Sequence, residues 1–167
     1  MTDEQKRIRG YLQAQGAKLS PADVVDKVRA AMEDLRRAAA AVPAARFEER
    51  PEPAEWSGNE VMAHVVAAGR HFGDQILAVL DGRSRGDLPS EAPPVERHSA
   101  DEWWRILERD RVALFERVGA ADPQTHLAET IEHRMFGPLN WREALLFMRL
   151  HDLDHAGQLQ KITAAFA

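Results

Sequence analysis

The chain has 167 residues, of which 44% are hydrophobic, enough to form one core without disulfides. Its formal net charge is −5, which argues against sequence-independent nucleic-acid binding, because that binding requires a basic surface. The absence of cysteine excludes disulfides, thiolate zinc sites and a cysteine nucleophile.

Neither the amino-terminal segment nor the apolar runs predict contact with a membrane. Residues 1–9 are charged and contain no apolar stretch, so we expect no signal peptide. No apolar run approaches the roughly 20 residues that cross a bilayer. We therefore expect one cytoplasmic domain over residues 1–167, with its core formed from about residue 20 onward.

The first two predicted helices are a weak one and a strong one. Thr2 and Gln5 are spaced as a capping box for a helix over about residues 3–15, which Gly16 is expected to end. The strong helix begins at Ser20, with Pro21 in the first helical position, and ends before residue 43. Its apolar stripe recurs at steps of three and four residues and consists of Val24, Val28, Met32, Leu35, Ala39 and Val42.

The second strong helix begins at Ser57, which forms an S-x-x-E capping box with Glu60, and ends at residues 81–82. Trp56 precedes it and is expected to pack onto its first turn. The apolar stripe of this helix consists of Val61, Val65, Phe72, Ile76 and Val79. Residues 83–97 are rich in glycine and proline and predict a loop.

The last two helices are also marked by capping pairs. Ser99 and Glu102 begin the third strong helix, which Gly119 is expected to end, and Asn140 and Glu143 begin the fourth after a connection over residues 120–139. No segment shows sustained strand alternation. The pattern predicts an all-α fold, a four-helix bundle with an additional short N-terminal helix. Its two long connections could be crossovers or could cover one end of the bundle.

Two histidines on the last helix provide the main chemical signal. His151 and His155 are four residues apart, a spacing that lets two imidazoles reach one metal ion. They lie within an apolar seam formed by Trp141, Ala144, Met148, Leu159 and Ile162. Buried imidazoles require a partner, and a divalent metal supplies one. The alternative is that both are core histidines hydrogen-bonded to their neighbours.

His64 is the third candidate ligand, because its position on the second strong helix turns it toward the core. Glu60, one turn earlier, could orient an imidazole or add a ligand, although its capping role already explains it. Three histidines suit zinc, nickel or ferrous iron better than magnesium or calcium, which prefer oxygen ligands. Three protein ligands also leave coordination positions open for a water molecule or a substrate atom.

Other polar residues are weaker candidates for the same cavity. His71 could line it or lie at the surface or in a lid, and His133 could border its mouth or be a solvated loop residue. Asp152 and Asp154 flank the histidine pair and could reach an imidazole, although solvation is the commoner state of such aspartates. His98 and His126 read as ordinary loop residues.

The four tryptophans, at positions 56, 103, 104 and 141, are expected to pack at the ends of the bundle. Trp104 is the one expected to be exposed. It is therefore a candidate contact for a homodimer.

Three motifs together resemble the DinB-like superfamily. They are Trp56-Ser57-x-x-Glu60-x-x-x-His64, His133-x-x-Phe136-Gly137-Pro138-Leu139 and His151-Asp152-x-x-His155-x-x-Gln158-Leu159. The resemblance extends from about residue 20 to the carboxyl end. It implies a four-helix bundle with a metal held by His64, His151 and His155. The family includes proteins assigned as metal-dependent hydrolases and enzymes that activate low-molecular-weight thiols. The related mycothiol-dependent isomerases carry a glutamate where this chain has His151.

These observations lead to three functional hypotheses. The first is a metal-dependent enzyme, a hydrolase or a thiol S-transferase, acting on a small molecule that could be a low-molecular-weight thiol. The second is a non-catalytic binding or stress-response module stabilised by the metal. The third is a helical scaffold whose histidines bind no metal. None of them requires nucleic acid or a membrane.

Overall fold

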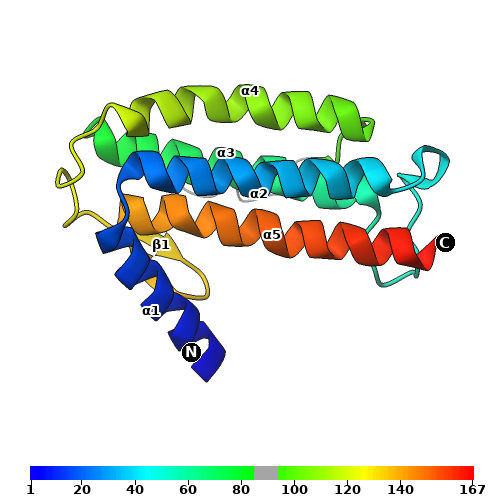
Figure 1. Ribbon diagram of the computed structural model, residues 1–167, viewed down its shortest axis with the longest axis horizontal. Helices are drawn as coiled ribbons and strands as arrows, with labels where there is room; N and C mark the ends of the chain where they lie inside the picture. Colours follow the sequence, from blue (N-terminus) through cyan, green and yellow to red (C-terminus); the bar gives the residue numbers. More distant parts are fainter. Residues whose placement is uncertain (85–93) are drawn as a thin grey trace.

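The computed structural model describes residues 1–84 and 94–167. Its helices are α1 (Asp3–Lys18), α2 (Pro21–Ala41), α3 (Gly58–Leu80), α4 (Ala100–Gly119) and α5 (Trp141–Ala165), with a 3-10 turn η1 at Ala44–Arg46. Two short strands, β1 (Ile131–His133) and β2 (Gly137–Leu139), precede α5. Helices α2 to α5 lie side by side as the predicted four-helix bundle (Figure 1).

The predicted helix starts are confirmed. The Ser20 side chain caps α2 by accepting a hydrogen bond from the backbone of Asp23. Capping boxes begin the other three helices of the bundle, at Ser57, Ser99 and Asn140. Each box satisfies backbone N–H groups that a helix start would otherwise leave without a partner.

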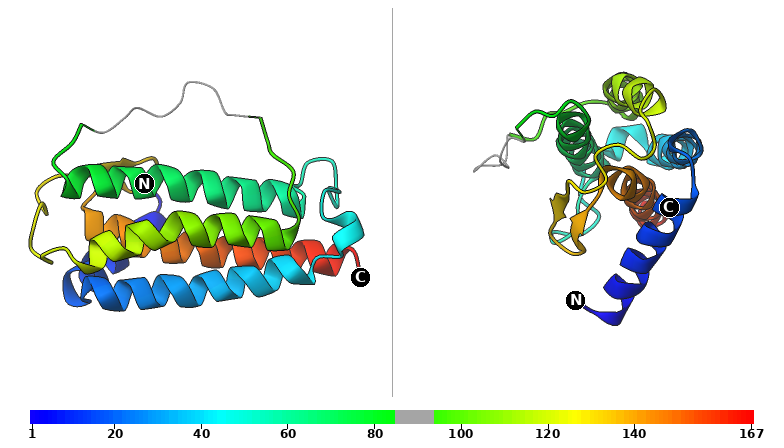
Figure 2. Two further views of the ribbon diagram at one scale, coloured as in Figure 1. Left: turned by 90° about the horizontal axis from the view of Figure 1, so that it is seen from above. Right: turned by 90° about the vertical axis from the view of Figure 1, so that its left-hand side faces the viewer.

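The packing and the directions of the helices show that the long connection from α3 to α4 is a crossover. Helix α5 packs on α1, α2 and α3, and α4 packs on α2 and α3. Helices α2 and α5 run in one direction, and α3 and α4 run in the other (Figures 1 and 2). The connection from α3 to α4 therefore joins opposite ends of the bundle. Part of the loop predicted over residues 83–97, residues 85–93, lies outside the described residues.

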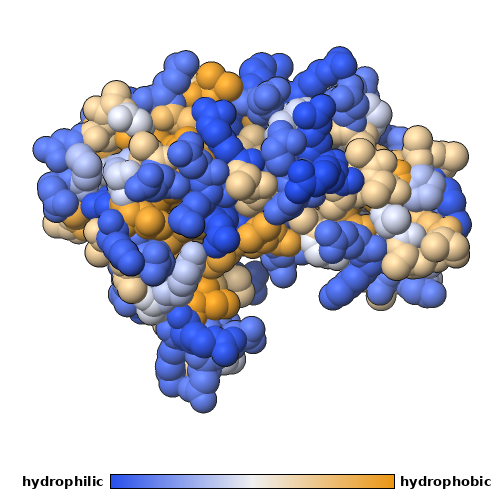
Figure 3. All heavy atoms as spheres, in the orientation of Figure 1, coloured by the Kyte–Doolittle hydropathy of each residue, from blue (hydrophilic) through white to orange (hydrophobic). Residues whose placement is uncertain are grey.

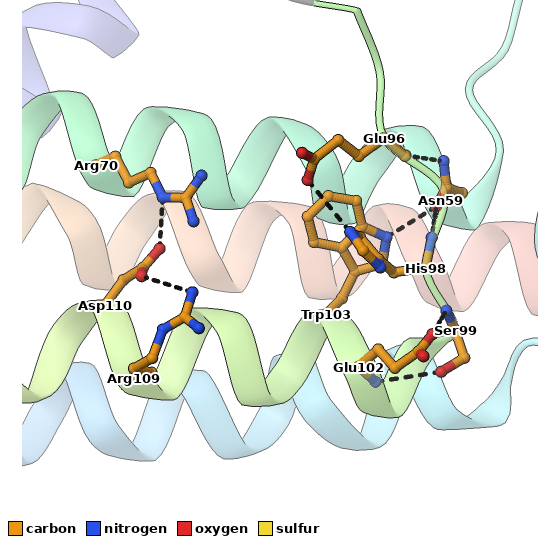
Figure 4. A network of polar contacts seen from close by, with 9 residues as sticks. All are labelled: Asn59, Arg70, Glu96, His98, Ser99, Glu102, Trp103, Arg109 and Asp110. Atoms are coloured by element: carbon orange, nitrogen blue, oxygen red, sulfur yellow. Dashed lines mark hydrogen bonds and ion pairs between the residues drawn. The ribbon is translucent and has the colours of Figure 1, made fainter.

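The end of this crossover is held to the start of α3 by Asn59. The side-chain amide of Asn59 donates to the carbonyl of Glu96 at 2.9 Å. Its oxygen accepts hydrogen bonds from the backbone of His98 at 3.1 Å and from the indole of Trp103 at 2.8 Å (Figure 4). One buried amide thus fixes the entry into α4 against α3.

A buried ion pair connects α4 with α5. The Arg111 guanidinium donates two hydrogen bonds to the Asp152 carboxylate, and the two side chains are 3% and 0% exposed. Burying two charges requires this close pairing, because each alone would lose its hydration. Asp152 follows His151 directly, so the pair anchors the turn of α5 that carries this histidine.

Helix α1 differs from the prediction at its C-terminal end. It continues through Gly16 to Lys18, because Gly16 lies against Glu143 of α5, where a Cβ atom would come 3.1 Å from the Glu143 side chain. Leu12 is fully buried, whereas the start of α1 projects from the bundle (Figures 1 and 2). The surface of this projecting part is hydrophilic (Figure 3).

The connection before α5 contains two short strands, which the sequence pattern did not predict. Strands β1 and β2 pair antiparallel, with Ile131 opposite Leu139 and His133 opposite Gly137. Each strand has three residues, too few for an alternating pattern to be recognised. Gly137 has a φ of 71°, a backbone conformation that favours glycine.

The expectation that Trp104 is exposed was wrong. Trp104 is 7% exposed, and the guanidinium carbon of Arg36 lies 5.2 Å from its ring centroid. The exposed tryptophan is Trp56, at 38%. Within the described part of the chain, no helix combines the length and the apolar character needed to span a membrane.

Candidate metal centre

Three histidines from two helices converge in the bundle. The Nε2 atom of His151 lies 3.1 Å from Nε2 of His64 and 3.2 Å from Nε2 of His155. One potential ligand atom from each residue lies within 4.8 Å of the other two. His155 is 8% exposed, and the other two are half-buried.

The helical geometry explains this arrangement. His151 and His155 project from successive turns on the same side of α5. His64 approaches from α3, which runs antiparallel to α5 and packs against it. The resulting group is a triangle of imidazoles supported by two packed helices rather than by loops.

Burial keeps the imidazoles of His151 and His64 neutral. Burial, with smaller contributions from the neighbouring His155 and His64, lowers the pKa of His151 to about 3. Burial also lowers the pKa of His64, with a smaller contribution from His155. At neutral pH both rings therefore retain a nitrogen lone pair, which is the form that binds metals.

Gln158 determines which nitrogen of His155 faces the cluster. Its Oε1 atom lies 2.8 Å from Nδ1 of His155 and can only accept, so Nδ1 carries the proton. The Nε2 atom of His155 consequently presents a lone pair to the other histidines. A hydrogen bond of this kind is the usual way in which proteins orient a metal-binding histidine.

The donor set fits a divalent transition metal. A neutral His151 carries at most one proton on Nε2, so it can donate to only one of its two close neighbours. The other nitrogen–nitrogen contact is then left without a hydrogen bond, whereas a cation between the three nitrogens would be bound by a lone pair from each. Imidazole nitrogens suit zinc, nickel or iron, whereas magnesium and calcium prefer oxygen ligands.

Trp56 lies over one side of the cluster. Its ring centroid is 5.1 Å from that of His64, and its plane is nearly parallel to that of His155, at 8° and 6.4 Å. We expected this side chain to pack on the first turn of α3. The histidine contacts were not expected, because Trp56 and His155 are far apart in sequence.

An open groove of about 370 Å³ adjoins this side of the cluster. Its lining residues are Ala54, Glu55, Trp56, His155, Gln158, Lys161 and Ile162. Because His155 belongs both to the cluster and to the groove wall, a molecule in the groove would lie next to the histidines.

Two of the three acidic candidates are paired with arginines away from the cluster. Glu60 accepts from the backbone of Ser57 and forms an ion pair with Arg50, which is the main cause of its lowered pKa. Asp152, for which solvation was the commoner expectation, is fully buried in its pair with Arg111. Asp154 is exposed.

The remaining histidines lie in different surroundings. His71 is half-buried, and its ring contacts that of Phe72 at 5.4 Å. His133 is 8% exposed, so it is buried rather than at the surface of a loop. His98 packs its ring edge-on against Trp103 at 4.6 Å, and His126 contacts Glu129.

Comparisons with known proteins agree with this fold. The model of the DinB superfamily matches residues 11–159. The crystal structure of TT2238, described as a four-helix bundle protein, is similar to this chain with a TM-score of 0.64 and 21% identity. That similarity covers 85% of this chain and 99% of the other, and at such low identity it shows the fold alone. The comparison with curated proteins found no match.

Proposed function

The chain belongs to the DinB superfamily, and we propose that it is a metal-dependent enzyme whose metal is held by His64, His151 and His155. The observation that carries this proposal is the convergence of the three imidazoles, with His155 oriented by Gln158. The metal would be zinc, nickel or iron, according to the nitrogen donor set.

Three protein ligands favour catalysis over a purely structural site, because structural zinc is normally closed by four side chains. When bound, a divalent metal lowers the pKa of a coordinated water or thiol toward neutrality and so supplies a nucleophile that the cysteine-free chain lacks. The protein's contribution is to position the ligands and to shield one side of them with Trp56.

The groove beside His155 supports a small-molecule substrate. Its indole and aliphatic walls could hold an apolar portion, while Gln158 and Lys161 offer hydrogen-bond donors. The reactions that fit are hydrolysis by an activated water and transfer of a low-molecular-weight thiol to an electrophile. A module that merely uses the metal for stability would need no such groove.

Metal uptake is the first test. Untagged protein is stripped of metal, loaded separately with zinc, nickel and ferrous iron, and analysed for bound metal. We expect about one equivalent for the wild type and a loss of stoichiometric uptake for His155→Ala. His71→Ala is the matched control, because His71 lies on α3 outside the cluster. Retained uptake by His155→Ala would refute the ligand assignment.

Turnover is the second test. The loaded protein is assayed with bacterial thiols plus electrophiles, and separately with ester and amide substrates. We expect turnover in one of these two panels that depends on the metal and is lost in His155→Ala. A fully loaded protein without turnover would instead support the non-catalytic module. Less than about a tenth of an equivalent of bound metal would support the scaffold hypothesis.

A further inference from the structure

A second cavity lies between α3 and α4. It is a groove of about 290 Å³, and none of the three clustered histidines lines it. Its apolar side chains are those of Val66, Leu77, Leu107 and Leu114. Apolar cavities of about 150 Å³ bind benzene, so this groove has room for a substituted benzene ring.

Helix packing does not require the glycine at position 73, which lines this groove. Gly73 is buried in the interior of α3, where glycine is less favourable for the helix than alanine. Among the described residues, a Cβ atom there would meet only the Leu114 side chain, at 3.6 Å, which is an ordinary van der Waals contact. The missing side chain therefore leaves room in the groove that packing of α3 on α4 does not explain.

The wall of the groove contains a hydrogen-bond donor without a partner. Arg111 is 2% exposed, and its two Nη groups donate to Asp152. Its Nε atom is buried and has no acceptor in the described part of the chain. A Cβ atom on Gly69 would lie 3.6 Å from Nε, so this edge of the guanidinium faces a residue without a side chain. A buried donor without an acceptor is unfavourable, and both residues line the groove.

The charged groups at the groove favour a neutral ligand. The charge of Arg111 is already matched by Asp152, and Arg70 of α3 donates to Asp110 of α4 at 2.6 Å (Figure 4). The lining also includes the exposed carboxylate of Asp74. An anionic ligand would meet these carboxylates, whereas a carbonyl oxygen accepts a hydrogen bond without adding a charge.

We propose that the groove between α3 and α4 is a second binding site, for a small, uncharged and largely apolar molecule that carries one carbonyl oxygen. The apolar part lies over Gly73, against Leu107 and Leu114, and the oxygen accepts a hydrogen bond from Nε of Arg111. This site is separate from the proposed metal centre and requires no metal.

Two probes of the same shape test the site. Acetophenone and α-methylstyrene differ only in carrying C=O or C=CH2 at one position. The full chain is labelled with nitrogen-15 and titrated with each probe in the presence of a chelator, so the result is independent of the metal centre. We expect both probes to give saturable shifts of the Gly69 and Gly73 backbone amides. Only acetophenone should shift the Nε–H signal of Arg111.

Substitutions at Gly73 test where the ligand lies. Gly73→Ala should raise Tm, because alanine favours the helix and its Cβ fits. It should also weaken acetophenone binding about threefold, because one methyl group enters the occupied space. Gly73→Leu should abolish binding. The matched control is Gly10→Ala on α1, where a Cβ meets nothing within 4 Å, and its affinity should equal that of the wild type.

The results that would overturn the proposal are specific. Acetophenone that gives no saturable shift at Gly69 and Gly73 would show that the groove does not bind this class of molecule. An affinity unchanged in Gly73→Ala would place the probe elsewhere, and this variant decides the question even if Gly73→Leu does not fold. Binding that leaves the Arg111 Nε–H signal unmoved would refute the assigned donor. An equal loss of affinity in Gly10→Ala would show that the Gly73 effect is not local.

Discussion

At the scale of single residues, the candidate site depends on the protonation of its imidazoles. His155 reaches the cluster through Nε2 because its Nδ1–H group donates a hydrogen bond to the amide oxygen of Gln158. His151 remains neutral because it is buried beside two other histidines. In both cases the metal-free protein already has a nitrogen lone pair that can bind a cation.

Gln158 should therefore contribute to metal affinity. We expect Gln158→Leu to weaken zinc binding about 10- to 100-fold, because His155 loses the acceptor that fixes its tautomer. Competition with a chromophoric chelator measures this affinity. Gln160→Leu is the matched control, since Gln160 is exposed two positions later on the same helix. Equal affinities for the two variants would contradict the orienting role.

The histidines should also make the metal-free protein sensitive to acid. The pKa of His151 is about 3 in the fold but near 6.5 in the unfolded chain. The contribution of neutral His151 to the free energy of unfolding is fully present above about pH 6.5. It is lost as the pH falls toward about 3, because only the unfolded chain takes up the proton in this range. The slope is about 1.4 kcal/mol per pH unit for one proton. The lowered pKa values of His64 and His133 act in the same direction.

Urea unfolding at pH 7, 6 and 5 in the presence of a chelator measures this dependence. His151→Phe should lower the slope of the unfolding free energy against pH by about 1.4 kcal/mol per pH unit, the value for one proton. His71→Phe serves as the control. Identical slopes for the wild type and His151→Phe would show that the burial of His151 does not affect acid stability.

At the scale of the elements, α5 organises the molecule. It packs on α1, α2 and α3, carries two of the three clustered histidines, and is joined to α4 by the buried pair of Arg111 and Asp152. Arg111 also lies close to α3, where a Cβ atom on Gly69 would come 3.3 Å from its guanidinium. This ion pair therefore lies where three helices meet.

Breaking this pair should be costly. We expect Asp152→Ala to lower the free energy of unfolding by about 3–5 kcal/mol, because Arg111 would keep a buried, unpaired charge. The double variant Arg111→Met, Asp152→Leu removes both charges and should lose much less. As a control, Asp101→Ala breaks an exposed pair with Arg105 and should cost less than about 1 kcal/mol. Chemical denaturation compares them, and equal losses for Asp152→Ala and Asp101→Ala would contradict this account.

At the scale of the whole molecule, the proposed metal would join two antiparallel helices. His64 belongs to α3, and His151 and His155 belong to α5, so the ion would add a cross-link inside the bundle. A ligand that binds only the folded state raises stability by mass action. The proposed function thus predicts a measurable coupling between metal binding and unfolding.

Thermal unfolding should show this coupling. With free zinc at 100 times its dissociation constant, we expect about 2.7 kcal/mol of added stability, which corresponds to a rise in Tm of about 5–10 °C. A chelator should reverse the rise. The control is the double variant His64→Ala, His155→Ala, whose Tm should not respond to zinc. A rise of the same size in this variant would place the metal elsewhere.

Much of the fold is encoded in short stretches of sequence. Ser20, Ser57, Ser99 and Asn140 mark helix starts because their side chains bond to backbone groups within three residues, whatever the rest of the chain does. The apolar stripes then predict a bundle, since each helix must cover one face. The spacing of four residues between His151 and His155 likewise predicts the part of the site that lies on one helix. The pairing of His155 with Gln158 was missed, although their separation of three residues on one helix already indicated it.

Other features depend on residues that are distant in sequence, and only the tertiary structure decided them. The burial of Asp152 requires Arg111 on another helix, and the burial of Trp104 involves Arg36. The same holds for the approach of Trp56 and His64 to the pair on α5, and for the crossover between α3 and α4. Local patterns fix which side chains lie one turn apart, because covalent geometry sets that distance. Which helices become neighbours is determined by the packing of all helix faces together. This packing places His64 of α3 beside the two histidines of α5.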